Sequence, residues 1–302
     1  MSTTSEEIYE EYYVPLQSKL PIFASLGIFL TVFGMGNILV DMQAGAEHTV
    51  GAWILMAGGL VLGFTLFIWF STVIRENHAN MYSAQMNRSF VWSMSWFILS
   101  EIFFFAAFFG ALFYVRIFVV DWIGGVGDRG PSNLLWPDYV PEWPLLNTPD
   151  PARFPGAEHS MGWFGLPLIN TILLFSSSFT VNWAHHGIKE GNRKKLTLWL
   201  SITVALGVAF LAFQVLEYHE AYTELGLKLN AGIYGTTFFM LTGFHGAHVT
   251  LGTFMLMVML GRAFKGHFTA DDCFGFEAAA WYWHFVDVVW MGLFIFVYIL
   301  GS

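Results

Sequence analysis

The stretch FVWSMSWFILSEIFFFAAFFGALFYVRIF, residues 90–118, decides the class of fold. Glu101 is its only acid and Arg116 its only base, and its apolar residues run on continuously instead of alternating with polar ones. A membrane-spanning helix needs about 20 mostly apolar residues, whereas a barrel strand alternates. The stretch therefore predicts a helix that crosses a bilayer, because a helix satisfies its own backbone hydrogen bonds there.

Further stretches of this kind lie at 21–40, 51–73, 163–184, 197–216, 233–260 and 276–300. Hydrophobic residues make up 56% of the chain and charged residues 12%, against about 25% charged residues in soluble domains. We therefore predict an all-α integral membrane protein with seven transmembrane helices. We expect a tail at 1–20, two helices within 21–73, a loop at 74–89 and five helices within 90–300, including a long loop at 119–162.

Composition excludes several classes of function. The net charge of −9 argues against a nucleic-acid partner. Cys273 is the only cysteine, which excludes a disulfide framework and a Cys-rich zinc or iron–sulfur site. Signal and transit peptides are basic, whereas residues 1–19 hold one base, Lys19, and four acids, Glu6, Glu7, Glu10 and Glu11. We expect the chain to insert through its own first apolar span.

The basic residues predict the orientation. With the N-terminus in the cytoplasm, the inner segments hold nine bases: Lys19, Arg75, Arg88, Lys189, Arg193, Lys194, Lys195, Arg262 and Lys265. The outer segments hold four: Arg116, Arg129, Arg153 and Lys228. Cytoplasmic loops carry an excess of Lys and Arg, so we expect a cytoplasmic N-terminus and an external C-terminus.

The long loop at 119–162 is rich in proline and tryptophan. Its prolines are Pro131, Pro137, Pro141, Pro144, Pro149, Pro151 and Pro155, and its tryptophans Trp122, Trp136 and Trp143. Prolines disfavour a helix, and tryptophans suit the membrane interface. We favour an ordered interfacial loop that contacts its neighbours over a catalytic segment.

Five ionisable residues lie near the middle of predicted spans: Glu101, His245, His248, His284 and Asp287. A charge at the centre of a membrane helix is costly, so these side chains must face protein, water or a partner. The histidines and carboxylates could build a metal site, because His245 and His248 share a helix face, as do His284 and Asp287. Hydrogen bonds between helices are the alternative, which we favour because the surrounding Trp and Phe leave little room for a haem.

Glu101 differs from the others because its span holds no base before Arg116. Desolvation disfavours the charged carboxylate, so we expect Glu101 to be protonated at neutral pH. It could then donate a structural hydrogen bond or relay protons, and structural use is the more common. Glu217 and His219 lie at the outer end of the fifth span, where we expect both to reach water.

Several segments together resemble the cytochrome c oxidase subunit III family. They are FGFEAAAWYWHFVDVVW at 274–290, GFHGAHV at 243–249, TVNWAHH at 180–186 and VIRE at 73–76. Glu101 before its phenylalanines is similar to the buried acid of the family. The resemblance covers about residues 20–300.

The resemblance implies two helices set apart from five by a V-shaped, lipid-filled cleft. It implies that this chain holds no haem, copper or catalytic residue, because the metals belong to partner subunits I and II of a translocase that reduces O2 with electrons from cytochrome c. His245, His248, His284 and Asp287 are then structural. The chain would stabilise the catalytic subunit and sustain its proton uptake. The long loop and the absent transit peptide favour a bacterial inner membrane.

The resemblance also implies bound phospholipid. The positions that match its head-group contacts are Trp69, Arg75, Glu76, Arg262 and His267. Phe70 and Ser71 depart from the family, which often has a Trp and a base there. An arginine suits a phosphate because its planar fork donates two hydrogen bonds at once.

Other functions remain as alternatives. The closest is subunit III of a quinol oxidase, although many such subunits lack the first two spans. A stand-alone proton channel or carrier using Glu101 would not require the 274–290 segment. A retinal photoreceptor needs a lysine in the last span, and 276–300 contains none.

The basic asymmetry predicts a topology that reporter fusions can test. Fusions after Lys195 and Lys265 should report cytoplasm, and fusions near Asp138 and Ser302 should report the outside, because bases resist translocation. A cytoplasmic C-terminus would overturn the number of spans.

Overall fold

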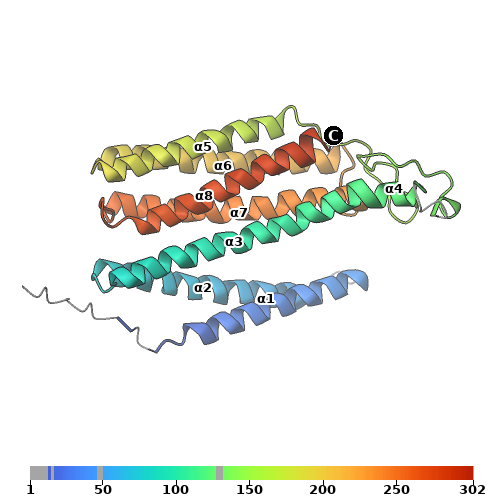
Figure 1. The fold of residues 1–302 in the computed structure, drawn as a ribbon. Coiled ribbons are helices and arrows are strands. Elements are labelled where there is room, and N and C mark those ends of the chain that lie inside the picture. The colour runs from blue at the N-terminus through green and yellow to red at the C-terminus, as the bar shows by residue number, and fades with distance from the viewer. Residues whose placement is uncertain (1–12, 15–16, 46–49, 127–131, 302) are drawn as a thin grey trace, which may run out of the picture. The chain divides into compact units, whose positions relative to one another are not determined.

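The computed structural model describes residues 13–14, 17–45, 50–126 and 132–301, and regular structure within these ranges is entirely helical (Figure 1). The chain divides into two compact units, residues 1–90 and 91–302. Several residues of the sequence predictions lie outside the described ranges, namely Glu6, Glu7, Glu10, Glu11, Arg129, Pro131 and Ser302.

The first unit is built around an antiparallel pair, α1 (Leu20–Gln43) and α2 (Val50–His78). Glycines set the contact: a Cβ on Gly34 would lie 2.4 Å from the backbone nitrogen of Leu55, and one on Gly58 would lie 2.5 Å from that of Thr31. Small residues let two membrane helices approach through their backbones. Most of their large apolar side chains are exposed, as a lipid- or partner-facing surface requires, and about a third are half-buried.

The second unit holds the longer helical run. Here α3 (Ala84–Tyr114), which begins in the first unit, continues through the π-helix η1 (Val115–Val119) and the short α4 (Val120–Ile123). After the long loop come α5 (Leu166–Lys189), α6 (Arg193–Thr223), α7 (Gly232–Lys265) and α8 (Phe274–Leu293), which η3 (Phe294–Ile299) extends. The pairs α5–α6, α6–α7, α7–α8 and α5–α8 all pack, closing a four-helix arrangement (Figure 1).

Trp283 of α8 lies at the centre of this bundle and is fully buried. Its indole nitrogen donates to Ser177 Oγ of α5 at 2.8 Å. A Cβ added to Gly207 of α6 or to Gly252 of α7 would come within 2.9 Å of the indole ring. One side chain therefore joins four helices, and two glycines make room for it.

Six helices of the described chain are long and apolar enough to cross a membrane, and the predicted seventh, α5, needs a separate account. α5 has 24 residues and so rises about 36 Å, which exceeds the hydrocarbon thickness of about 30 Å. Its hydropathy is lower because it carries Asn170, Ser177, Thr180 and Asn182, most of them buried against other helices. The helices and the all-α class are confirmed, with α5 as a polar member of the bundle.

The helix ends differ from the prediction. Residues 74–89, predicted as a loop, are mostly helical, since α2 runs to His78, α3 starts at Ala84 and only 79–83 connect them. The loop predicted at 119–162 is helical as far as Ile123 and ends at Leu166. An apolar run marks only the part of a helix within hydrocarbon, whereas these helices continue into polar sequence.

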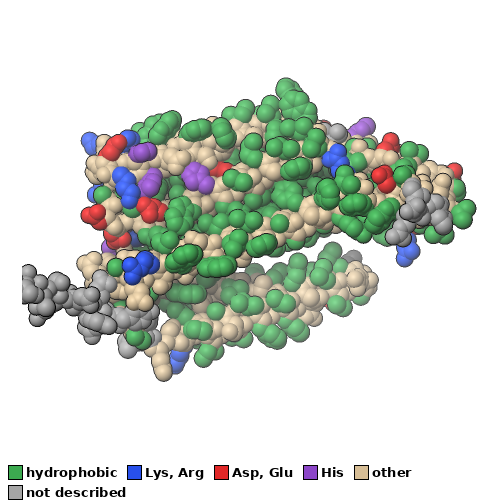
Figure 2. Space-filling model, viewed as in Figure 1, with side chains coloured by type: hydrophobic (Ala, Val, Ile, Leu, Met, Phe, Trp, Pro, Cys, Tyr) green, Lys and Arg blue, Asp and Glu red, His purple; other side chains and the backbone are tan. Residues whose placement is uncertain are grey.

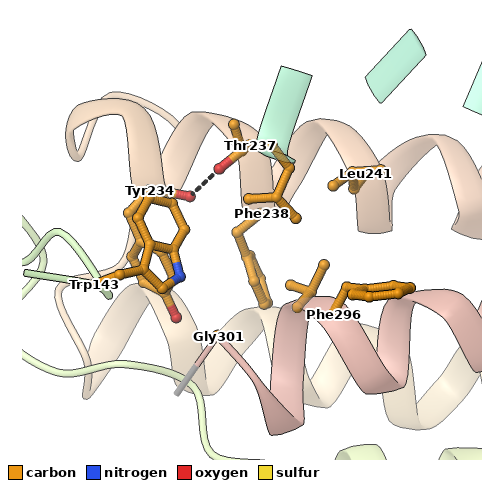
Figure 3. Close-up of a pocket in the computed structure, with 9 residues that line it drawn as sticks. Trp143, Tyr234, Thr237, Phe238, Leu241, Phe296 and Gly301 are labelled. Carbon is orange, nitrogen blue, oxygen red and sulfur yellow. Dashed lines mark hydrogen bonds between the residues drawn. The ribbon is translucent and has the colours of Figure 1, made fainter. Parts of the chain in front are cut away.

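The described part of the long loop is ordered and packed, as predicted. The amide of Glu158 donates to Leu225 O at 3.0 Å, and the amide of Met161 donates to the Tyr234 hydroxyl at 3.3 Å. The Trp143 ring stands edge-on against the Tyr234 ring, 5.7 Å between centroids. Figure 3 shows the cavity beside them, between Trp143, Phe238 and Phe296. Its volume is about 10 Å³, room for about one water and not for a cofactor.

The α1–α2 contact predicts a position-specific effect in one helix. Gly34→Leu should destabilise the first unit by roughly 1–3 kcal/mol, because the new side chain meets backbone that cannot move aside. Gly36→Leu is the matched control, since a Cβ there meets nothing within 4 Å. Protease resistance of the chain in native membranes measures the difference. Equal resistance of the two variants would contradict a glycine-mediated contact.

Candidate functional site: polar contacts inside the helix bundle

A seam of hydrogen bonds joins α5 and α8. Besides the Ser177–Trp283 bond, Trp290 Nε1 donates to Thr171 Oγ1 at 3.0 Å. Further pairs are Asn182 with His284, Ser178 with His284 and Asp287, and His185 with Glu277. The polar residues recur at three- to four-residue spacing on each helix, so they occupy one face. The polar residues that α5 contributes to this seam account for its low hydropathy.

His284 and Asp287 lie in the middle of the seam. His284 Nδ1 is 3.1 Å from Ser178 Oγ, and its Nε2 is 3.2 Å from Asn182 Oδ1. The Ser178 hydroxyl also donates to Asp287 Oδ2, whose distance to His284 Nδ1 is 3.8 Å. The predicted shared face of these two residues is confirmed, and α5 supplies their other partners.

His245 and His248 have hydrogen-bond partners on different helices, which argues against the metal site that the sequence left as a possibility. His245 is fully buried, and its Nε2 lies 3.2 Å from the Val286 carbonyl oxygen of α8. His248 Nε2 lies 2.9 Å from Glu101 Oε2 of α3. The two histidines share one face of α7, but their hydrogen bonds go to different helices, His245 to α8 and His248 to α3. The midplane histidines and carboxylates therefore enter separate contacts, and a common metal site has no support in the described residues.

The contacts of the Glu101–His248 pair indicate which of its atoms carry hydrogens. His248 Nδ1 lies 2.6 Å from the Phe244 carbonyl oxygen, which can only accept, so Nδ1 carries a hydrogen. The contact between Nε2 and Glu101 then needs one more proton, on either atom. The pair is a neutral acid with a neutral imidazole or a carboxylate with an imidazolium, and its net charge is zero in both. Sequence reasoning missed this partner because it searched only the span that holds Glu101.

Glu217 corrects a second expectation. Predicted to reach water, it is fully buried and accepts a hydrogen bond from the Tyr298 hydroxyl at 2.5 Å. The long loop, which bonds to Leu225 and Tyr234, lies over this end of the bundle. His219, two residues on, is exposed as predicted.

The candidate lipid residues fall into both units. In the first, Trp69 is 52% exposed and Arg75 is exposed, with its Nη2 donating to Thr72 Oγ1 at 3.1 Å. Glu76 is instead engaged by protein: Tyr82 donates to its Oε2 at 2.8 Å and Tyr13 to its Oε1 at 3.1 Å. Burial and this carboxylate raise the pKa of Tyr82, so its phenol stays a neutral donor.

In the second unit, Arg262 and His267 are both half-buried near the end of α7. The Arg262 guanidinium lies over the Phe268 ring at 4.7 Å, a cation–π contact. The Arg262 Nε is buried without an acceptor among the described residues.

Comparison with known proteins covers both units. The family model described as Cytochrome c oxidase subunit III matches residues 10–149 and 152–302. Cytochrome c oxidase subunit 3 of Dugong dugon is 38% identical over 267 residues, 82% of this chain and 91% of that protein. The subunit 3 of Equus asinus is 38% identical over 292 residues, 96% of this chain and 97% of its own. "Probable cytochrome c oxidase subunit 3" of Rickettsia felis is 36% identical over 294 residues, 96% of this chain and 95% of its own.

The seam predicts that one serine matters and its neighbour does not. Ser177→Ala leaves the buried Trp283 N–H without an acceptor and should cost about 1–3 kcal/mol. Ser176→Ala is the control, because the described structure shows no hydrogen bond for that side chain. Thermal unfolding midpoints of the chain in its native membrane assembly provide the measurement. A Ser177→Ala midpoint no lower than that of the control would show that the bond contributes little.

Proposed function

Because this chain belongs to the cytochrome c oxidase subunit III family, we propose that it is the non-redox core subunit of a proton-pumping oxidase that reduces O2 to water with electrons from cytochrome c. It is part of the oxidase complex, and haem and copper would be held by subunits I and II. Its own work would be to stabilise the catalytic subunit through turnover and to sustain that subunit's proton uptake. The quinol-oxidase alternative shares the fold and differs in the electron donor.

The observation that carries this proposal is that the polar residues inside the bundle form hydrogen bonds between helices. Glu101 pairs with His248, His284 and Asp287 bond to α5, and His245 faces a carbonyl oxygen. Side chains occupied in this way hold helices together and leave no set of ligands for a redox metal in the bundle interior. A supporting role in the complex fits such a chain better than catalysis within it.

Proton support is assigned to the Glu101–His248 pair. Their side chains are 21% and 15% exposed, so the pair lies close to the outer surface of the second unit. The proton that Glu101 and His248 share can lie on either side chain without a change in the net charge of the pair. The pair would tune proton supply to a neighbouring subunit. A stand-alone channel would need a continuous polar path, and the Phe104 and Phe105 rings lie close to the imidazole.

Lipid binding is proposed for bases of both units. Arg75 of the first unit is exposed and Arg262 of the second is half-buried, and a phosphate would accept hydrogen bonds from their guanidinium groups. Trp69 would lie against acyl chains, and His267 would assist near Arg262. Glu76 would act indirectly, by holding Tyr82 and Tyr13 beside the end of α2.

The retained helices α1 and α2 favour cytochrome c over quinol as electron donor. Localisation in a bacterial inner membrane, with the N-terminus in the cytoplasm and the C-terminus in the periplasm, follows from the distribution of bases. Similarity to the Rickettsia felis protein over 96% of the chain supports a bacterial oxidase.

Exchange of Glu101 tests the proposal on the whole oxidase. Glu101→Gln should assemble with haem-containing partners and reduce oxygen at near-normal initial rate, since the amide can still donate to His248 Nε2. Proton uptake should slow, because the amide has no ionisable proton to pass on. Glu101→Leu is the matched comparison, which leaves Nε2 without a partner and should lower thermal stability by about 1–3 kcal/mol.

Haem spectra of the purified complex, oxygen consumption with reduced cytochrome c or quinol, and proton uptake provide the readouts. An assembled Glu101→Gln complex that reduces no oxygen would contradict a supporting role. Oxidation of quinol but not of cytochrome c would select the alternative.

A further inference from the structure

We propose that His185, Cys273 and Glu277 form a binding site for a borderline-soft divalent cation, with Zn²⁺ as the best match. The site lies where α5 ends and α8 begins, within the second unit. The single cysteine excluded only a Cys-rich site, and the family resemblance implied that this chain holds no metal. The three ligands come together only through folding, and no function discussed above uses them as a group.

The geometry is close to that of a metal site. His185 Nε2 lies 3.1 Å from Glu277 Oε1, and Cys273 Sγ lies 3.3 Å from the same oxygen. All three ligating atoms lie within 4.8 Å of one another. Tetrahedral Zn²⁺ with ordinary bond lengths would separate such ligands by about 3.4–3.6 Å. Small side-chain rotations therefore suffice to enclose the ion, with water in the fourth position.

The ligand set selects the kind of ion. Imidazole nitrogen, thiolate sulfur and carboxylate oxygen are the donors that Zn²⁺ takes in proteins, whereas Mg²⁺ and Ca²⁺ prefer oxygen alone. Among the described residues this is the one group of three such side chains close enough to share an ion. Zn²⁺ has no redox chemistry, so the site is compatible with a non-redox subunit.

Access and support differ between the three ligands. Cys273 is buried and lies at the N-terminal end of α8, so the fold holds its side chain in place. His185 and Glu277 are 35% and 26% exposed, which leaves a path from solvent. The charged and histidine side chains of the second unit gather at the end where α8 begins (Figures 1 and 2). Part of the site is thus held by the fold while part faces water.

Lys189 would compete with the ion for two of the three ligands. Its ammonium group donates to Cys273 Sγ at 3.2 Å and forms an ion pair with Glu277 Oε1 at 3.0 Å. A cation that needs both atoms must displace it. Lys189 would therefore lower the affinity of the site for the metal. Removal of this lysine should raise zinc affinity only if the three residues bind the ion.

Zinc binding to the whole oxidase, washed with a chelator and then equilibrated with Zn²⁺, tests the site. The wild-type complex should retain one zinc more than Cys273→Ser, and its zinc-edge X-ray absorption should contain a Zn–S distance of about 2.3 Å that this variant lacks. His185→Asn and Glu277→Gln should weaken binding at least about tenfold. Lys189→Met should tighten it roughly tenfold, because a competing unit charge is gone.

Two control variants keep the test specific. His186→Asn removes the adjacent exposed imidazole, and Lys195→Met removes a nearby charge that pairs with Glu190 instead. Both should bind zinc as the wild type does. Equal zinc content in the wild-type and Cys273→Ser complexes, or unchanged affinity in Lys189→Met, would overturn the proposal. None of these readouts depends on oxygen reduction, so they stand apart from the test of the proposed function.

Discussion

The hydrogen bond from the Trp283 indole to Ser177 is the contact on which the second unit depends. In lipid, an apolar surface gains nothing by meeting another apolar surface, so helices associate through close packing and polar contacts. Trp283 provides both, since its N–H bonds to α5 while its ring fits against Gly207 and Gly252. From α8, that single side chain contacts α5, α6 and α7.

The rest of the α5–α8 seam extends the same solution along the helices. Several polar residues that would be costly alone in hydrocarbon have a partner on the facing helix, as His284 has in Asn182 and Ser178. The buried side chain of Asn170, also on α5, has no such partner among the described residues. The seam also explains why α5 is too polar to qualify as a span by composition. A helix enclosed by other helices needs less hydrophobicity than one that faces lipid, and α1 and α2 show the opposite pattern of small buried and large exposed residues.

The two ends of the second unit differ in chemistry. At one end the long loop is folded over α6 and α7, where Trp143 meets Tyr234 and Glu217 is sealed in with Tyr298. At the other, the polar seam reaches the surface as His185 and Glu277, joined by Cys273 and Lys189. Glu101 and His248 connect α3 to α7 through a hydrogen bond. The proposed proton and metal sites thus use the same residue types as the structural contacts and differ from them in exposure and in partner.

The sequence by itself determined the membrane class, the helices and the family, because apolar runs and near-complete motifs such as 274–290 are local properties of the chain. It also indicated that His284 and Asp287 share a face, since that follows from helical spacing. Only the tertiary structure decided which helix each polar face meets. His248 meets Glu101, His245 meets Val286, Glu217 is buried instead of wet, and a single cysteine joins a histidine and a glutamate from α5 and α8. Periodicity fixes the direction of a side chain around its own axis, whereas its partner depends on how separate helices pack.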